Sequence, residues 1–483
     1  MFVDREAELD FLNAILERRH PTPAQFVLLY GRRRVGKTAL LRHWAERSGL
    51  PYTYWSAEKG PAALQRRELF NRLLGLSSTE GPAFDSWTSC WQAIANYLAG
   101  RRHILILDEF HYTATADPAT LSSLQHAWDH ILRESQVILL LCGSHVHAME
   151  LLQGHQSPLF GRFTGQWHLR PLPFAALREF FPTWSAEERV AAYAIVGGIP
   201  AYMEWLNPAL PLRDNIQRVI LAPGSMFTSE PALLLYDEIA EPGTHLAILK
   251  AIGAGCHTLA EISNAALVGK THLPAYLARL QDLRLVERRL PITVPPVKRR
   301  LAKVGRYHLA DPYFRFYFRF LHPFRDELPY RREQLLPALH DNLRAFVGGT
   351  AFEELCRRWI VEQARVKKLP FQVQEVGSHW SSTAQVDVVA MNWPDRHILL
   401  GECKWQEEEA LDRAVVRELI EEKAPRVLRQ LPNAEGWHVH YAFFARAGFT
   451  AAARAYVKKT GALLVDLEQL DSDLISGIVD DGN

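Results

Sequence analysis

The pattern of hydrophobic and polar positions divides the first part of the chain into short apolar runs separated by amphipathic stretches. Residues 4–16 repeat Leu and Ile at helical spacing, which predicts an amphipathic helix. Four apolar runs have the length of buried strands, and they lie at residues 26–30, 51–55, 102–107 and 136–142. Apolar strands that alternate with helices are typical of a parallel sheet covered by helices. We therefore expect an α/β domain at the start of the chain.

The first apolar run ends in a glycine-rich turn with the spacing of a phosphate-binding loop. Residues 31–38 satisfy the G-x-x-x-x-G-K-[ST] pattern between a strand and a helix. Glycines let the backbone approach phosphate, so that N–H groups and the helix N-terminus face the anion. Lys37 would reach the β- and γ-phosphates of ATP, and the Thr38 hydroxyl would hold Mg²⁺. The residues expected to line the nucleotide site are Gly31, Arg32, Arg33, Arg34, Val35, Gly36, Lys37, Thr38 and Ala39.

Polar residues at the ends of two later strands would complete a hydrolytic site. The run at 102–107 leads into Asp108 and Glu109, at the strand end where parallel sheets bind ligands. Asp108 is expected to hold Mg²⁺, and Glu109 to orient and deprotonate the attacking water. Ser144 follows the strand at 136–142 and is a candidate for contacting the γ-phosphate or the water. A simple exit from a strand into a turn explains Ser144 nearly as well.

Arg162 lies in a turn flanked by glycines. An arginine delivered near the γ-phosphate neutralises the charge that develops there. In a homo-oligomer, Arg162 would act in trans on the site of a neighbouring subunit. An ordinary solvated arginine in a turn is an equal alternative.

Seven segments within the first 210 or so residues occur in an order that is typical of a known family. They are residues 2–9, 30–38, 107–110, 141–144, 159–162, 170–174 and 196–202. In these segments the chain resembles the archaeal-type ATPases, which belong to the AAA+/STAND group of P-loop NTPases. The resemblance implies that Arg162 is the finger candidate and that Gly197 and Gly198 lie in a helical lid. His111 and His145 depart from the family pattern, where Pro and Ser are usual, and they lie close enough to the site to alter how water is positioned.

Composition narrows the class of protein. The chain has 483 residues, a length that suggests two to four domains, and its 48% hydrophobic and 23% charged residues are those of an ordinary globular protein. Five cysteines without a C-x-x-C pair argue against a zinc ribbon or a disulfide framework and indicate a cytoplasmic protein. The charged N-terminal segment is unlike a signal peptide, and the apolar runs are too short to span a membrane.

The segment from residue 244 to residue 310 has three helical patterns followed by two β-alternating runs. The helices are expected at residues 246–252, 258–263 and 271–283, and the strands at 285–290 and 305–309. This order is that of a winged helix-turn-helix. The segment holds eleven Lys and Arg against three Asp and Glu, a charge of about +8, with Lys298, Arg299 and Arg300 placed to contact DNA phosphates. Docking to another protein is the alternative.

The aromatic residues at 311–323 are expected to form a packed helix.

The last part of the chain, about 140 residues, has a pattern of its own. Residues 351–360 predict a helix that carries Glu353 and Glu354. Residues 385–390 and 398–405 predict two strands that lie side by side. Strand alternation would place the acidic and basic residues of the second strand on one face.

Four charged side chains of this region resemble the core of the PD-(D/E)xK nucleases, found in restriction-endonuclease-like domains. The resemblance implies that Asp387 and Glu402 hold Mg²⁺, with Glu353 as a further ligand. Lys404 would position or activate the water that attacks the phosphodiester. Glu354 could serve in place of Glu353. Val386 stands where the name-giving proline is usual.

The sequence as a whole predicts an α/β protein: a P-loop NTPase with a parallel sheet and helical lid, followed by a winged helix-turn-helix and a restriction-endonuclease-like domain. The expected domains are 1–175 (ATPase core), 176–240 (lid), 241–310 (winged helix), 311–340 (helical linker) and 341–483 (nuclease-like). The expected function is that of an ATPase with a Mg²⁺-dependent DNA endonuclease, acting in defence or in the processing of mobile elements or other DNA. An ATP-dependent regulator that binds DNA or a partner without cleaving is the main alternative, and a signalling NTPase with no nucleic acid is a third.

Overall fold

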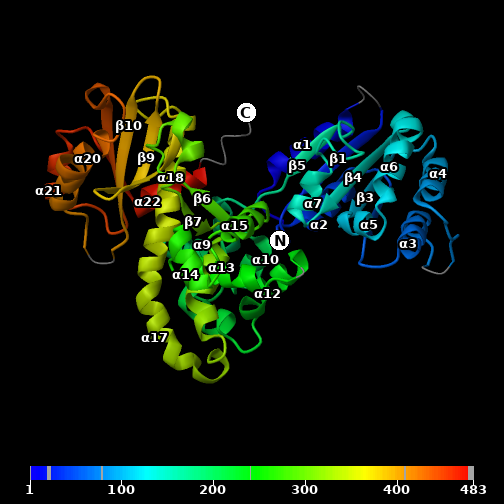
Figure 1. Cartoon of the computed structure of the whole chain (residues 1–483), viewed down its shortest axis with the longest axis horizontal. Coiled ribbons are helices and arrows are strands. Elements are labelled where there is room, and N and C mark those ends of the chain that lie inside the picture. Colours follow the sequence, from blue (N-terminus) through cyan, green and yellow to red (C-terminus); the bar gives the residue numbers. More distant parts are fainter. Residues whose placement is uncertain (1, 19–22, 78–79, 240, 407–408, 477–483) are drawn as a thin grey trace. The chain divides into compact units, whose positions relative to one another are not determined.

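The chain divides into two units in the computed structural model, and Figure 1 shows the elements of each. The structure describes residues 2–18, 23–77, 80–239, 241–406 and 409–476. The first unit comprises Met1–Leu172 and Ile199–Tyr202, and the second comprises Pro173–Gly198 and Met203–Asn483. No helix in the described ranges is long and apolar enough to cross a membrane.

The first unit is built on a five-stranded sheet in which every neighbouring pair is parallel. The strands are β1 (Gln25–Tyr30), β2 (Tyr52–Ser56), β3 (His103–Asp108), β4 (Val137–Gly143) and β5 (Gly165–His168), in the spatial order β2-β3-β4-β1-β5. Its helices are α1 (Glu6–Glu17), α2 (Lys37–Arg47), α3 (Ala62–Leu74), α4 (Trp87–Leu98), α5 (His111–Ala116), α6 (Ala119–His130) and α7 (Val146–Leu151). The four strands predicted from apolar runs are confirmed. The short edge strand β5 was missed, because its half-buried residues form no apolar run.

The core of the first unit explains why these runs become strands. Every residue of β3 and β4 is buried, and α3, α4 and α6 pack apolar side chains against the sheet. Trp87 and Trp91 of α4 are among the largest fully buried side chains. Helix α4 begins at a capping box, in which Ser86 and Ser89 satisfy each other's backbone N–H groups. The polar ends of β1, β3 and β4 are thus held on a rigid support.

The second unit begins with helices and continues through three short helices into a two-stranded antiparallel sheet. The helices before the sheet are α8 (Leu177–Phe180), α9 (Ala186–Val196), α11 (Leu212–Asn215), α12 (Met226–Glu238), α13 (Gly243–Gly253), α14 (Leu259–Ala266) and α15 (Leu273–Asp282), and α10 (Pro200–Glu204) is shared between the units. The sheet pairs β6 (Val286–Arg289) with β7 (Arg306–Leu309). A capping box between Thr258 and Glu261 starts α14. The elements occur in the order that the sequence predicted.

The loop between β6 and β7, residues 290–305, lies against the C-terminal sheet, and we call it the ribbon loop. Its Ile292 N–H donates to the Ser378 carbonyl over 3.1 Å, and Thr293 Oγ1 lies 2.7 Å from His379 Nδ1. Arg299 donates to both carboxylate oxygens of Glu375. Arg299 is therefore held by an acidic residue of its own chain, contrary to the expectation that it faces DNA phosphate.

The C-terminal sheet has five strands in the order β12-β11-β10-β9-β8. They are β8 (Glu375–Trp380), β9 (Gln385–Asn392), β10 (His397–Lys404), β11 (His438–Ala445) and β12 (Leu463–Asp466). Strands β8, β9 and β10 pair antiparallel, whereas β10, β11 and β12 pair parallel. The surrounding helices are α16 (Pro312–Phe316), α17 (Leu328–Val347), α18 (Glu353–Arg365), α19 (Arg413–Arg417), α20 (Ala424–Leu428), α21 (Ala451–Val457) and α22 (Leu467–Ser476), and Figure 1 shows α17 as the long helix that leads toward α18.

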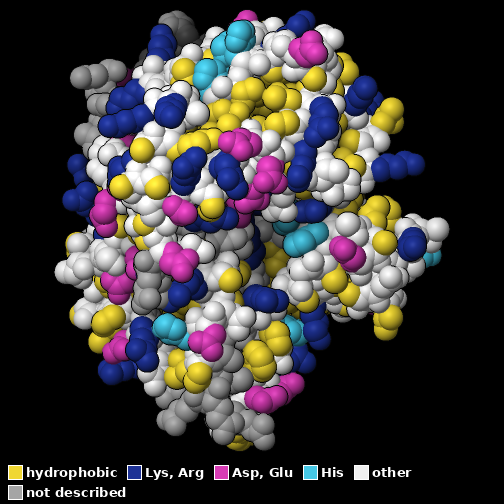
Figure 2. All heavy atoms as spheres, turned by 90° about the vertical axis from the view of Figure 1, so that its left-hand side faces the viewer, with side chains coloured by type: hydrophobic (Ala, Val, Ile, Leu, Met, Phe, Trp, Pro, Cys, Tyr) yellow, Lys and Arg dark blue, Asp and Glu magenta, His cyan; other side chains and the backbone are white. Residues whose placement is uncertain are grey.

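Two apolar cores cover the C-terminal sheet. One includes residues of α9, α18 and α22, and the other includes residues of α19, α20 and α21. The aromatic segment at 311–323 is packed as expected, with Tyr313, Phe314 and Phe316 fully buried. On the face shown in Figure 2, Lys and Arg side chains are interspersed with Asp and Glu, and they form no single basic patch among the described residues in that view.

Candidate active sites

The predicted phosphate-binding loop lies between β1 and α2. Gly31 leaves no room for a side chain, because a Cβ atom there would lie 2.3 Å from the Leu169 carbonyl oxygen. Gly36 is the N-cap of α2 and has φ +98°, a left-handed conformation that glycine adopts without strain. The two glycines hold the loop at the start of a helix, where backbone N–H groups bind phosphate.

Lys37 is buried within this loop. Its ammonium group donates to the Gly31 carbonyl over 2.8 Å and to the Arg32 carbonyl over 3.0 Å. A triphosphate would offer charged oxygens in place of these neutral acceptors, and charge-assisted hydrogen bonds are the stronger kind. The side chain is thus stored next to the position where the sequence predicts phosphate.

Arg5 supports the loop from the N-terminal segment. Its guanidinium is buried and donates to the Val35 carbonyl over 2.9 Å and to the Arg170 carbonyl over 3.0 Å. Glu8 accepts a third bond over 2.9 Å and balances the charge. The sequence placed this segment in the family pattern but gave Arg5 no function, because the contact joins residues that are far apart in the chain.

The two predicted Mg²⁺ ligands of the ATPase site lie together. Thr38 Oγ1 donates to Asp108 Oδ2 over 3.1 Å. The Tyr54 hydroxyl of β2 donates to the same carboxylate oxygen and lies 3.2 Å from Thr38 Oγ1. Burial, followed by the charge of Asp108, raises the pKa of Tyr54 far above its usual value, so the hydroxyl stays protonated. Tyr54 carried no signal in the sequence.

A hydroxyl and one carboxylate fit a Mg²⁺ site at this position. Mg²⁺ keeps several waters and is commonly bound through one or two carboxylates together with substrate phosphates. Thr38 and Asp108 supply oxygen donors of that kind, beside the loop that would hold the phosphates. The Tyr54 hydroxyl would have to release one of them or share it when the ion binds.

Glu109 is held by Ser144, the residue that the sequence suggested for contact with the γ-phosphate or the attacking water. One Glu109 carboxylate oxygen accepts from both the N–H and the hydroxyl of Ser144, each over 2.9 Å. The same oxygen lies 3.4 Å from His111 Nδ1. Burial raises the pKa of Glu109, which suits a group that must take up a proton. Ser144 and His111 both touch the predicted base, whereas His145 instead caps α7.

Arg162 is engaged within its own unit. Its guanidinium donates to both carboxylate oxygens of Asp129, with distances of 2.7 to 3.1 Å, and to the Pro158 and Phe160 carbonyls. None of its hydrogen bonds to the described residues involves the phosphate-binding loop. Arg162 would therefore have to exchange Asp129 for phosphate in order to act as a finger.

The second predicted site lies on β9 and β10, which pair antiparallel. Lys404 Nζ donates to Glu402 Oε1 over 3.2 Å, so both side chains lie on one face, as the alternation predicts. Asp387 Oδ2 accepts from the Cys403 N–H over 3.0 Å. Burial, with the charge of Glu402 second, raises the pKa of Asp387 to about 6. Glu402 is buried and Asp387 is half-buried, so the two carboxylates repel each other, and a bound cation would relieve this repulsion.

Lys423 is a member of this site that the sequence did not suggest. Its ammonium group donates to both oxygens of Glu402 over 3.0 and 2.9 Å. It lies at the end of a π-helical turn, Glu418–Lys423. Acidic residues surround it in the sequence, so the segment resembles an ordinary solvated helix face. Two lysines thus neutralise one buried glutamate.

The two glutamates at the start of α18 have different partners. Glu354 pairs with Arg315 over 2.9 Å. Glu353 pairs with Arg357 over 3.3 Å, and burial together with nearby Asp387 raises the pKa of Glu353 to about 7. Glu353 is therefore the helix carboxylate beside the strand site, and Glu354 is a structural partner of Arg315.

The carboxylates do not form a ready-made metal cluster. Over the described ranges, no group of three or more His, Cys, Asp or Glu side chains could hold a metal ion. The assignment of Glu353, Asp387 and Glu402 as Mg²⁺ ligands therefore stays a prediction, and these side chains would have to move together to bind one ion. Asp387 and Glu402 alone still fit Mg²⁺, which is often bound through two carboxylates with water completing the shell.

Comparisons with known proteins place the chain among ATPases. Residues 2–206 match the family described as "ATPase domain predominantly from Archaea", and residues 317–417 match "Archaea bacterial proteins of unknown function". The chain is 33% identical over 411 residues to the uncharacterized protein MJECL04 of Methanocaldococcus jannaschii, covering 84% of this chain and 88% of that protein. It is also 49% identical over 47 residues to the uncharacterized ATP-binding protein MJ0423 of the same organism, covering 10% of this chain and 73% of that protein.

Solved structures give more distant matches. The Walker-type ATPase PABY2304 of Pyrococcus abyssi aligns over 66% of this chain and 96% of its own, at 20% identity and a TM-score of 0.45. The ORC2 protein of Aeropyrum pernix, in ADPNP–ADP complexes, aligns over 70% of this chain and 95% of its own, at 16% identity and a TM-score of 0.42.

Proposed function

Because the chain belongs to the family of archaeal-type ATPases, we propose that it hydrolyses ATP at its N-terminal site and cleaves DNA at its C-terminal site. DNA cleavage is proposed because Asp387, Glu402 and Lys404 lie close together on two paired strands. Paired carboxylates with a lysine beside them are the groups that metal-dependent phosphodiester hydrolysis requires.

In the ATPase half, the residues already lie near their proposed positions. Lys37 would exchange its two carbonyl acceptors for the β- and γ-phosphates, while Thr38 and Asp108 would hold Mg²⁺. Glu109 would accept the proton of the attacking water. The two hydrogen bonds from Ser144 would fix the direction in which the Glu109 carboxylate faces.

Arg162 would serve in trans. Its pair with Asp129 is a partly exposed ion pair, and such pairs contribute little to stability. A neighbouring subunit's γ-phosphate would therefore compete with Asp129 at modest cost. Supplying a cation from a second subunit would make hydrolysis depend on assembly.

In the nuclease half, Asp387 and Glu402 would hold Mg²⁺ when it is bound, and the ion would supply Lewis-acid activation of the scissile phosphate. Lys404 is partly exposed, so its ammonium group can leave Glu402 and face the attacking water or the phosphate. The raised pKa values of Asp387 and Glu353 leave either group able to exchange a proton near neutral pH.

DNA binding is proposed for the three helices α13, α14 and α15 and for the ribbon loop. The charge of about +8 over residues 244–310 supports DNA binding, since that segment contains eleven Lys and Arg and only three Asp and Glu. Lys298 and Arg300 remain candidates for phosphate contact on the ribbon loop. Arg299 would first have to leave Glu375, with which it pairs.

A regulator that binds without cleaving is the second candidate, and one observation favours it. Lys423 donates to both oxygens of Glu402, so the predicted metal ligand is already fully neutralised. A domain that had lost cleavage could keep this arrangement as a stable ion pair. In that case the protein would bind DNA but would leave it intact.

Cleavage of supercoiled plasmid and of linear single-stranded and double-stranded DNA, with Mg²⁺ or Mn²⁺ and with or without ATP, separates the two functions. We expect metal-dependent cleavage that Asp387→Asn and Glu402→Gln each remove, with unchanged ATP hydrolysis in both variants. Glu354→Gln is the matched control, because Glu354 pairs with Arg315, and it should keep cleavage. Absence of cleavage in every condition, with DNA binding retained, would establish the regulator.

A further inference from the structure

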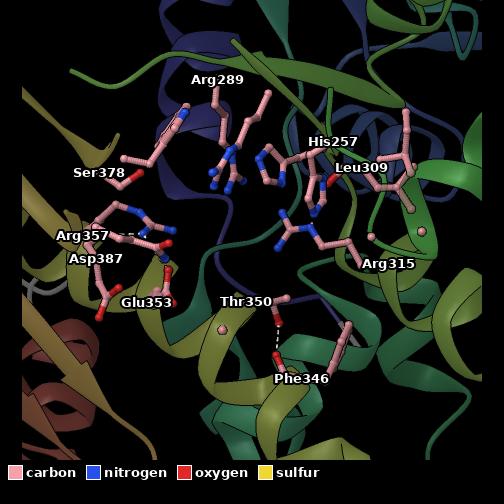
Figure 3. Close-up of a pocket in the computed structure, with 18 of the residues that line it drawn as sticks. His257, Arg289, Leu309, Arg315, Phe346, Thr350, Glu353, Arg357, Ser378 and Asp387 are labelled. Carbon is pink, nitrogen blue, oxygen red and sulfur yellow. Dashed lines mark hydrogen bonds and ion pairs between the residues drawn. The ribbon is translucent and has the colours of Figure 1, made fainter. Parts of the chain in front are cut away.

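A cavity of about 430 Å³ lies within the second unit beside the proposed nuclease carboxylates (Figure 3). Its lining includes Glu353 and Asp387 on one side and residues of β6, β7 and α13 on the other. This volume is in the range of pockets that enclose a small organic ligand, roughly 300–1,000 Å³. It is enough for about one nucleotide unit, whereas a base-paired duplex is much wider.

The cavity is lined by more positive than negative charge. Five arginines line it, against the two carboxylates of Glu353 and Asp387. They are Arg289, Arg306, Arg315, Arg319 and Arg357. Figure 3 shows Arg289, Arg315 and Arg357 pointing toward the same space from three different elements. A lining of this charge is complementary to a phosphate-bearing ligand.

Two of these arginines are partly neutralised by carboxylates outside the lining. Glu354 pairs with Arg315, and Glu287 pairs with Arg289 through one side of its guanidinium. Arg306 instead lies over the ring of Trp380, with its guanidinium carbon 5.1 Å from the ring centroid. A guanidinium has five N–H donors, so a single carboxylate partner leaves others for phosphate.

Flat rings lie among the arginines. His257 and His308 stack with ring centroids 4.4 Å apart, and Trp380 is also part of the lining. Burial lowers the pKa of His308 to about 2, so this ring is neutral and offers a π face. Arginines interleaved with flat rings are the means by which proteins bind single-stranded nucleic acid.

The ribbon loop supports one side of the cavity lining through β8. Four contacts tie it to β8: Ile292 to Ser378, Thr293 to His379, Arg299 to Glu375, and the Val304 carbonyl to the Trp380 indole N–H over 3.1 Å. Ser378, His379 and Trp380 also line the cavity, so these contacts hold part of its lining in place.

We propose that this cavity binds single-stranded DNA and delivers one strand to Asp387 and Glu402, so that the substrate of the C-terminal site is single-stranded rather than duplex DNA. The proposal rests on the proposed nuclease function for the identity of the reaction. Binding of the strand, however, depends on Arg289, Arg306 and the rings, and not on the metal site.

Binding is tested with the full chain carrying Asp387→Asn in the presence of EDTA, so that no cleavage occurs. Fluorescence anisotropy would compare a labelled oligonucleotide without self-complementarity with the blunt duplex of the same sequence. Adding Arg289→Gln and Arg306→Gln together should weaken single-strand binding about 10- to 100-fold and change duplex binding by less than about threefold. For the single strand, the slope of log K against log salt concentration should fall in magnitude by roughly 1.4, because two phosphate contacts are lost.

The control is Arg365→Gln, an arginine of α18 that does not line the cavity and pairs with Glu362. It should leave both affinities unchanged, and an unaltered circular dichroism melt of each variant would show that the fold is kept. Equal weakening of both substrates, or no weakening of the single strand, would overturn the proposal. If the single strand binds as expected but protein with Asp387 intact cleaves nothing, the cavity stands and the nuclease function fails.

Discussion

The two carboxylate sites of this chain balance their charges in opposite ways. In the ATPase site, the cation Lys37 donates to two neutral carbonyls, and Glu109 accepts from the neutral N–H and hydroxyl of Ser144. In the C-terminal site, Glu402 is bound by two ammonium groups, Lys404 and Lys423. Among the described residues, the hydrogen bonds of Lys37 and Glu109 are with neutral groups, so these charges can be met by an anion and a metal when they bind. The second is neutralised at rest, so its ligands must displace existing ion pairs.

The two sites therefore differ in how easily a ligand can replace the partners that the charged side chains have now. A site held by neutral partners gives up weak hydrogen bonds when its charged ligand arrives, and the exchange is favourable. A buried glutamate with two lysines gives up strong charge-assisted bonds, so its ligand must offer more than they do. We therefore expect tight nucleotide binding at the first site and weak metal binding at the second until one lysine moves away.

The largest effect is expected at Lys37. Lys37→Ala should weaken ATP binding by roughly 100-fold or more, because the triphosphate loses its main compensating cation in a buried loop. Equilibrium binding of a fluorescent ATP analogue measures it. Glu109→Gln is the matched comparison, and it should keep binding while hydrolysis falls. Parental hydrolysis in the Gln variant would remove Glu109 from the mechanism.

Asp387 should limit stability at neutral pH. Its pKa lies at about 6 in the folded chain instead of the ordinary 3.8, so folding opposes its ionisation. The stability that this group contributes is present below pH 3.8 and is lost as the pH rises through 6. Asp387→Asn should therefore be more stable than the parent by about 3 kcal/mol at pH 8, with little difference at pH 4.

Thermal unfolding of both proteins without metal at pH 4 and pH 8 measures this difference. Mg²⁺ should raise the midpoint of the parent at pH 8 and leave that of the Asn variant unchanged, because a bound cation removes the repulsion that the substitution also removes. Identical midpoints of the two proteins at pH 8 in the absence of metal would show that folding does not oppose the ionisation of Asp387.

Lys423 should restrain metal binding. Lys423→Met nearly keeps the length of the side chain but removes its charge, and it frees Oε2 of Glu402 while Oε1 keeps its bond from Lys404. Mg²⁺ should then bind roughly tenfold more tightly, the effect of about 1.4 kcal/mol from losing one competing cation. Isothermal titration calorimetry measures the affinity, with Lys458→Met, an exposed lysine, as the control. Weaker metal binding in Lys423→Met would show that this lysine supports the site.

The smallest effect is expected at Ser144. Ser144→Ala removes one of two hydrogen bonds to Glu109, while the backbone N–H remains, so kcat for ATP should fall about three- to tenfold with KM little changed. Steady-state hydrolysis measures it. Ser144→Thr should restore most of the rate, because its hydroxyl can replace the lost bond. A large rise in KM would assign Ser144 to binding nucleotide.

What the sequence could predict was local. Glycine spacing and a strand that ends in two acids fixed the first site, because both depend on residues close together in the chain. Contacts between distant segments escaped it: Arg5 with Val35, Tyr54 with Asp108, and Lys423 with Glu402. Each joins side chains whose individual positions look ordinary.

The second unit shows the same limit on a larger scale. The capped helix after Thr258 and the paired strands of Asp387 and Glu402 were predicted from periodicity. Strands β8, β11 and β12 were not expected, and neither was the attachment of the ribbon loop to β8. Because the ribbon loop is attached to β8, Arg299, which was expected to contact DNA, forms an ion pair with Glu375. Local charge could not reveal a partner 76 residues away.

The bond between Arg5 and the Val35 carbonyl makes the first few residues of the chain part of the nucleotide site. A protein prepared without residues 2–5 would lose a buried guanidinium behind the phosphate-binding loop, although no residue of the loop had been altered. A bulky N-terminal fusion that displaced this segment would have the same result. Purified protein with weak ATPase activity should therefore be examined first for the integrity of its N-terminus.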